Sequence, residues 1–106
     1  MMFTRLYIGE NDDLGKASFR DTLVTLSESE LVPRTLVFWN NAVKACVEGS
    51  PLLATINKIE RLGVRVLVAG HALEKLGIKG EMRAGKLANH FDLLEAMNQV
   101  QKVVTF

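Results

Sequence analysis

The sequence is poor in the residues that mark several classes of protein. It contains one cysteine, Cys46, which excludes an intrachain disulfide framework and a cysteine-rich metal site. Its 13 lysines and arginines are balanced by 12 aspartates and glutamates, and they form no basic run. Phosphate binding needs clustered cations, so we expect no nucleic-acid partner. No apolar run approaches the length of a membrane span, so we expect no membrane segment.

Other absences bear on the cellular location and on cofactor binding. The chain passes from Met1 to Arg5 without the apolar run and small-residue cleavage site of a secretion signal, so a cytoplasmic location is expected. No Gly-x-Gly-x-x-Gly pattern follows the first predicted strand, which argues against a dinucleotide site, and no cofactor is predicted. The 106 residues are enough for one compact domain, spanning 1–106, and too few for two.

What the sequence does contain is a regular alternation of strand-like and helical patterns. The expected strands are 4–9, 35–40, 64–68, 85–89 and 102–106. The expected helices are 16–29, 41–49, 51–62, 71–78 and a last one from residue 89. Strands that alternate with helices predict βαβ units, right-handed crossovers and an α/β protein with a mainly parallel sheet between helical layers.

Local signals set several of these boundaries. Ser50 is expected to cap a helix that has Pro51 at its first position and Gly63 just past its end. Asn89 is expected to cap the last helix, and the apolar face of that helix consists of Leu93, Met97 and Val100.

The residue that follows the third predicted strand is a candidate for chemistry. In parallel α/β sheets, sites gather at the carboxyl ends of strands, and here Gly70 and His71 follow such a strand. An imidazole at this place can act as an acid or a base near neutral pH. The alternative is that His71 holds the turn or contacts a neighbouring subunit.

Cys46 is the second catalytic candidate. A thiolate is favoured by a nearby positive charge, and Lys44 is close in sequence. Lys44 is two residues away, however, which on a helix places it on a different face, and Glu48 has the opposite effect. The alternative is a small buried apolar side chain, which is the usual role of a free cysteine.

Polar residues after the first and second strands complete the candidate cleft. Asp12 and Asp13 can bind a cation or raise one another's pKa, but they lack the spacing of a defined metal loop and also suit a helix start. Asn40, Asn41 and Lys44 can hold backbone groups and an anion, or simply brace the loop. His90 has no partner histidine at ligand spacing, so no metal site is predicted.

Four stretches carry a resemblance to a known family. They are GENDDLG at 9–15, FWNNAVKACVEGS at 38–50, GVRVLVAGHALEKLGI at 63–78 and NHFDLLEAMNQVQKVVTF at 89–106. In this order they make nearly the whole chain similar to the DsrE/DsrF-like family, and within it to the carboxyl-terminal domain of YedF-type proteins. Asn40 and Lys44 match the family pattern.

The resemblance implies a fold, an assembly and a chemistry. The fold is a three-layer α/β/α sandwich with a mainly parallel five-stranded sheet and a flavodoxin-like topology. The assembly is a homo-oligomer, with a sulfur-carrier protein as a further partner. The chemistry is sulfur relay through a persulfide on a cysteine near a strand end. Relatives commonly have a Cys-Gly-x-Cys stretch where this sequence has Ala69 and Ala72 at the thiol positions, and a methyl group cannot carry sulfur.

Three functions follow, and the position of Cys46 separates the first two. The first is a small sulfur-relay protein, which has only Cys46 left as an acceptor. The second is a non-catalytic module that binds a ligand or a partner protein in the cleft at the strand carboxyl ends. The third is a hydrolase or lyase that uses His71 with Asp12 or Asp13. An exposed Cys46 favours transfer, and a Cys46 packed in the core favours binding.

Overall fold

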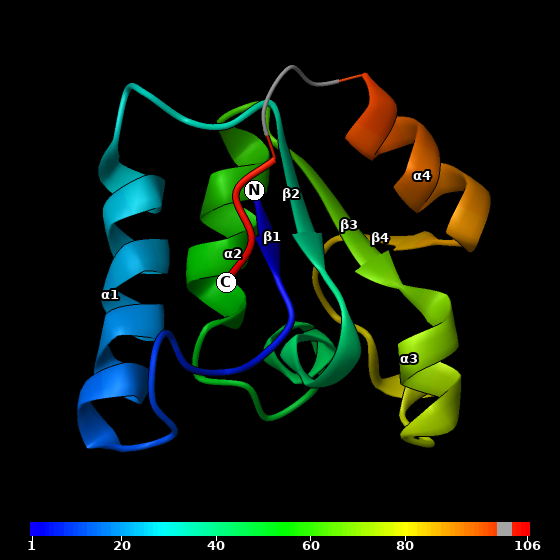
Figure 1. The fold of residues 1–106 in the computed structure, drawn as a ribbon, viewed down its shortest axis with the longest axis horizontal. Coiled ribbons are helices and arrows are strands. Elements are labelled where there is room, and N and C mark those ends of the chain that lie inside the picture. Colours follow the sequence, from blue (N-terminus) through cyan, green and yellow to red (C-terminus); the bar gives the residue numbers. More distant parts are fainter. Residues whose placement is uncertain (100–102) are drawn as a thin grey trace.

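A four-stranded parallel sheet forms the centre of the computed structural model, which describes residues 1–99 and 103–106 (Figure 1). Its strands are β1 (Met2–Phe3), β2 (Thr35–Phe38), β3 (Arg65–Ala69) and β4 (Lys86–Ala88). They lie in the order β1-β2-β3-β4, and each pairs in parallel with the next. The expectation of an α/β protein with a parallel sheet is confirmed.

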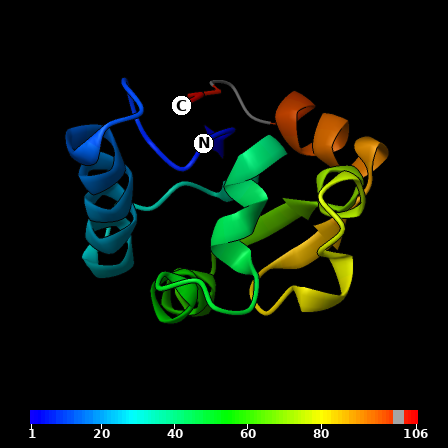
Figure 2. The same ribbon diagram turned by 90° about the horizontal axis from the view of Figure 1, so that it is seen from below.

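Helices cover both faces of the sheet. The α-helices are α1 (Asp13–Glu28), α2 (Leu53–Arg61), α3 (Gly70–Lys75) and α4 (His90–Asn98), and the 3₁₀ helices are η1 (Asn40–Cys46) and η2 (Lys79–Glu81). Figures 1 and 2 show α1 and α2 together on one side of the sheet and α4 on the other. This arrangement is consistent with a flavodoxin-like fold. In the described residues, no helix has the length and apolarity needed to cross a membrane.

The core lies where these helices meet the two central strands. All four residues of β2 and the last four of β3 are buried, which explains why both strands read as continuous apolar runs. From α2, Ile56 and Ile59 are fully buried against the sheet. Removing such a side chain from water contributes about 2 kcal/mol. On the other face, Leu93 of α4 is also fully buried.

The first strand is shorter than expected and lies earlier in the chain. β1 covers Met2–Phe3, whereas a strand over 4–9 was predicted. Residues 4–9 leave the sheet and turn back toward the start of α1, where the Ile8 amide donates to the Gly15 carbonyl at 3.0 Å. The Ile8 amide therefore bonds to the helix, whereas the Thr4 amide donates to the Phe106 carbonyl at 2.9 Å, so neither amide pairs with β2.

The predicted fifth strand does not form, so the sheet has four strands. Lys102, the first residue of that prediction, lies outside the described residues. Val103–Phe106 run beside β1, where the Met2 amide donates to Val104 at 2.8 Å and the Phe106 amide donates to Met2 at 2.8 Å. The pairing amounts to one isolated bridge, between Met2 and Thr105, because β1 itself is only two residues long.

The capping predictions had mixed outcomes. Asn89 caps α4 as predicted: its side chain accepts from the Asp92 amide, and Asp92 reciprocates in a capping box. Gly63 follows α2 in a left-handed conformation, as expected (φ 95°). Ser50 was placed wrongly, because Pro51 and Leu52 form a turn and α2 begins at residue 53. Val100, predicted on the face of α4, lies outside the described residues.

Candidate functional site

The carboxyl ends of the four parallel strands meet at one edge of the sheet. This edge is the lower one in Figure 1, where the strands lead into η1 and α3. η1 begins two residues after β2, and α3 begins directly after β3. Every residue predicted for the site follows a strand on this edge, and the structure divides them among separate environments.

Cys46 lies at the end of η1 with none of its surface exposed. Burial raises the pKa of its thiol well above the ordinary value, and the nearby negative charge of Glu60 raises it further. Its main-chain oxygen accepts from the amides of Arg83 and Ala84, which fixes the segment. Lys44 is exposed, so it points away from the thiol and does not favour a thiolate. Cys46 therefore has the environment of a core residue.

The end of β3 offers no reactive group of its own. Ala69 and Ala72, which flank Gly70 and His71, are 0% and 6% exposed. Gly70 between them is partly buried, and a Cβ built on it would lie 3.1 Å from a methyl group of Leu87. This part of the edge is closely packed by small residues.

His71 is exposed and shares a hollow with two predicted neighbours. Asn40, Asn41 and His71 line a depression of about 360 Å³ together with Ala72, Lys75 and Leu76. Asn40 adopts a left-handed backbone conformation (φ 51°), which asparagine tolerates better than most residues. The second and third strands thus bring three of the predicted polar residues together.

His90 is a neighbour of His71 that the sequence interpretation missed. The two imidazole rings are 5.2 Å apart between centroids, and His90 also contacts the partly buried Trp39 ring, at 5.7 Å. The sequence pattern does not show this proximity, which depends on strand pairing: β3 and β4 are adjacent, Ala69 pairs with Ala88, and each histidine lies two residues further on. No group of three or more potential metal-binding side chains occurs within 1–99 and 103–106.

Asp12 and Asp13 begin α1 and belong to a different part of the edge. The Asp12 side chain caps the helix by accepting from the Gly15 amide at 2.8 Å, and Asp13 is the acidic residue of the first turn. Neither aspartate lines the depression around His71. The acid–base pairing of His71 with Asp12 or Asp13 therefore has no support in the geometry.

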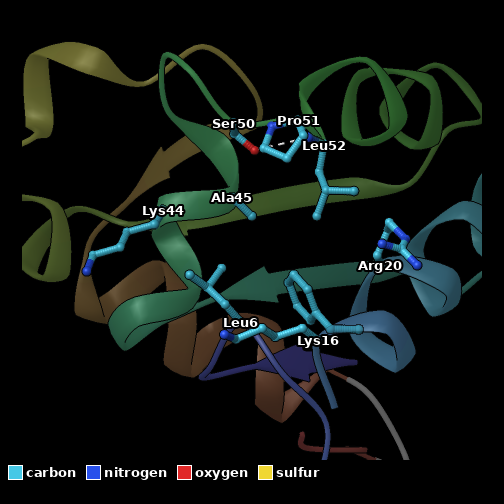
Figure 3. A pocket seen from close by; sticks show the side chains of 9 residues that line it. Leu6, Lys16, Arg20, Lys44, Ala45, Ser50, Pro51 and Leu52 are labelled. Atoms are coloured by element: carbon cyan, nitrogen blue, oxygen red, sulfur yellow. Dashed lines mark hydrogen bonds between the residues drawn. The ribbon is translucent and has the colours of Figure 1, made fainter. Parts of the chain in front are cut away.

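A pocket that sequence reasoning did not identify lies between α1, η1 and the turn before α2 (Figure 3). Its volume is about 360 Å³. Nine residues line it: Leu6, Lys16, Phe19, Arg20, Lys44, Ala45, Ser50, Pro51 and Leu52. Of the predicted site residues it contains Lys44 alone. The signal that could have revealed it is the pair Lys16 and Arg20, which are one helical turn apart and flank the apolar Phe19.

Comparison with known proteins identifies the fold. No family model matches the chain, and no curated protein matches its sequence. The crystal structure of the YchN protein from E. coli is similar, with a TM-score of 0.73 over 99% of this chain and 96% of that one, at 16% sequence identity. A likeness at that level of identity concerns the fold alone. The chain has the DsrE-like fold of YchN.

Proposed function

We propose that the protein is a non-catalytic binding module of the DsrE/DsrF-like family, related to YedF-type domains, that passes no sulfur through a thiol of its own. The observation that carries the proposal is the complete burial of Cys46. A persulfide forms on an accessible thiolate, and this thiol is both enclosed and held protonated. Because the chain has one cysteine, no other thiol can take its place.

The binding part of the proposal rests on the carboxyl edge of the sheet. Three hollows of about 330 to 360 Å³ open there, two beside His71 and one beside Lys44. Cavities of this size suit small molecules. The function of such a module is to hold a ligand, either alone or for a partner such as a sulfur-carrier protein that supplies its own thiol.

Self-association is the remaining part of the proposal. The α4 side of the molecule exposes large apolar side chains: Phe91 is 84% exposed, Leu94 55% and, on the edge strand β4, Leu87 48%. Apolar residues exposed close together are typical of contact surfaces. We define Leu87, Phe91 and Leu94 as the α4 patch, and a second copy of the chain is the partner it is proposed to contact.

The test of the central proposal is intact mass after incubation with a polysulfide donor. We expect no gain of sulfur by the native wild type, and alkylation of Cys46 by iodoacetamide only after unfolding in urea. A matched control is Asn41→Cys in a Cys46→Ala background, which places an exposed thiol on the same 3₁₀ helix and should be both persulfidated and alkylated.

A gain of sulfur by Cys46 in the native wild type would contradict the proposal. If the native wild type gains one sulfur and Cys46→Ala does not, the chain relays sulfur through a thiol that becomes accessible by local opening. The binding-module proposal would then be wrong.

A further inference from the structure

We infer that the pocket between α1 and η1 binds a small organic anion, meaning a carboxylate or phosphate attached to an apolar body. This inference deepens the proposed function and rests on it. Three features of the pocket support it: its apolar floor, the sign of the charges around it and its size.

The floor of the pocket is apolar. Phe19, Ala45 and Leu52 are 2%, 2% and 8% exposed, and the partly buried Leu6 packs against the same core. Figure 3 shows the side chain of Leu6 and that of Leu52 directed into the space between α1 and η1. Such a floor stabilises an apolar group by removing it from water, and it offers nothing to a free inorganic ion.

All charged residues around the pocket are positive. Lys16 and Arg20 come from α1 and Lys44 from η1, and no carboxylate is among the nine lining residues. Within residues 1–99 and 103–106, neither lysine takes part in an ion pair. Arg20 pairs with Asp21 at 3.3 Å, but both side chains are mostly exposed, and such a pair contributes little.

The positions of the cations indicate which of them contact the ligand. Lys16 and Arg20 are four residues apart, so they extend from the same face of α1. In Figure 3 both lie beside the floor, whereas the ammonium group of Lys44 points away from Leu52. The anionic group of the ligand is therefore placed at α1, and Lys44 adds attraction at longer range.

The size of the pocket and the positive charges around it exclude large ligands, cations and nucleic acid. A volume of about 360 Å³ is at the lower end of small-molecule sites, so the ligand is about the size of a short fatty acid or an aryl acid. A cationic ligand would be repelled by Lys16, Arg20 and Lys44. Three cations around one hollow do not form the extended basic stripe that nucleic acid needs.

The experiment is a calorimetric and NMR titration of the full chain with four probes: octanoate, octyl phosphate, octan-1-ol and inorganic phosphate. We expect at least one of the two organic anions to bind tenfold or more tightly than octan-1-ol, with amide shifts at Phe19 and Ala45, and inorganic phosphate not to bind. The two anions distinguish a carboxylate from a phosphate headgroup.

Two double variants test whether the positive side chains of Lys16 and Arg20 bind the anion. Lys16→Gln with Arg20→Gln should weaken anion binding at least tenfold and leave the affinity for octan-1-ol unchanged. Lys58→Gln with Arg61→Gln makes the same change of net charge at the far end of α2 and should have no effect. Equal loss in both variants, or equal binding of octan-1-ol and the anions, would overturn the inference.

Different results would contradict the binding-module proposal and the inference of an anion site. Sulfur uptake by Cys46 would contradict the binding-module proposal whatever the pocket binds. Absence of anion binding in a chain that takes up no sulfur would contradict the ligand class alone.

Discussion

Cys46 combines full burial with a titratable group, and this combination makes the stability of the protein depend on pH. The pKa of the folded thiol is raised by burial, whereas an unfolded thiol has a pKa of about 8.5. Well below pH 8.5 the thiol is neutral in both states and has no effect. As the pH rises above that value, the unfolded chain loses a proton that the folded chain keeps, so the unfolded state is favoured.

We therefore expect the wild type to lose stability between pH 8 and pH 10, by about 2 kcal/mol more than Cys46→Ala over the same interval. The measurement is the free energy of unfolding in urea at a series of pH values. Comparison with the alanine variant isolates the contribution of the thiol. Parallel curves for the two proteins would mean that the thiol ionises as readily in the folded chain as in the unfolded one.

Neighbours on different elements were predicted only in part: Asn40, Asn41 and His71 line one hollow as expected, whereas Asp12 and Asp13 lie outside it. Asn89 was identified as a cap because its partner Asp92 is three residues away. His90 was missed because its neighbour His71 lies on a different element, across β3 and β4. Periodicity does not carry that information, since it describes one element at a time. The pocket beside Lys16 and Arg20 was missed although these two residues are close in sequence, because the rest of its lining comes from other elements.

At the scale of elements, the first turn of α1 depends on a glycine. The predicted helix begins at residue 16, but Gly15 already lies inside α1, where the loop before the helix folds back over it. A Cβ built at Gly15 would lie 1.8 Å from the main-chain oxygen of Glu10. The glycine thus permits the contact between the loop and the helix, next to Lys16 in the proposed anion site.

We expect Gly15→Ala to lower the free energy of unfolding by about 2 kcal/mol, because the backbone of the loop must move to admit a methyl group. Gly80→Ala is the matched control: a Cβ there has open space, and we expect a change within about 0.5 kcal/mol. Urea unfolding of both variants gives the comparison. A change within about 0.5 kcal/mol in both variants would mean that the loop moves without cost.

The two central strands and the edge strand β4 were predicted well, whereas the opposite edge of the sheet was predicted poorly. β2 and β3 form continuous apolar runs because both of their faces are covered, and their existence followed from that pattern. The error over 4–9 arose because an apolar run at the edge has other partners for its backbone: the Thr4 amide donates to Phe106 and the Ile8 amide donates to Gly15 of α1. The local sequence does not show whether residues 4–9 pair with β2 or leave the sheet.

At the scale of the whole molecule, the α4 patch makes self-association testable. We expect the wild type to be oligomeric and Phe91→Ser with Leu94→Ser to be monomeric, because the exposed apolar area that drives association is lost. Leu14→Ser with Leu31→Ser is the control, since these leucines are 75% and 89% exposed elsewhere on the surface. The measurement is mass by light scattering during gel filtration. A monomeric wild type would contradict the expectation.

The pairing of β1 with the last residues of the chain also determines when the sheet is completed. The Thr4 hydroxyl donates to the Phe106 carbonyl at 2.8 Å, and the rings of Phe3 and Phe106 stack at 5.2 Å, so the two segments that meet are separated by most of the chain. The partners in β2, β3 and β4 are much closer in sequence. Loop closure costs more entropy as the loop lengthens, so the central pairs form first. The edge built by the two terminal segments is the last to form during folding and the first to open.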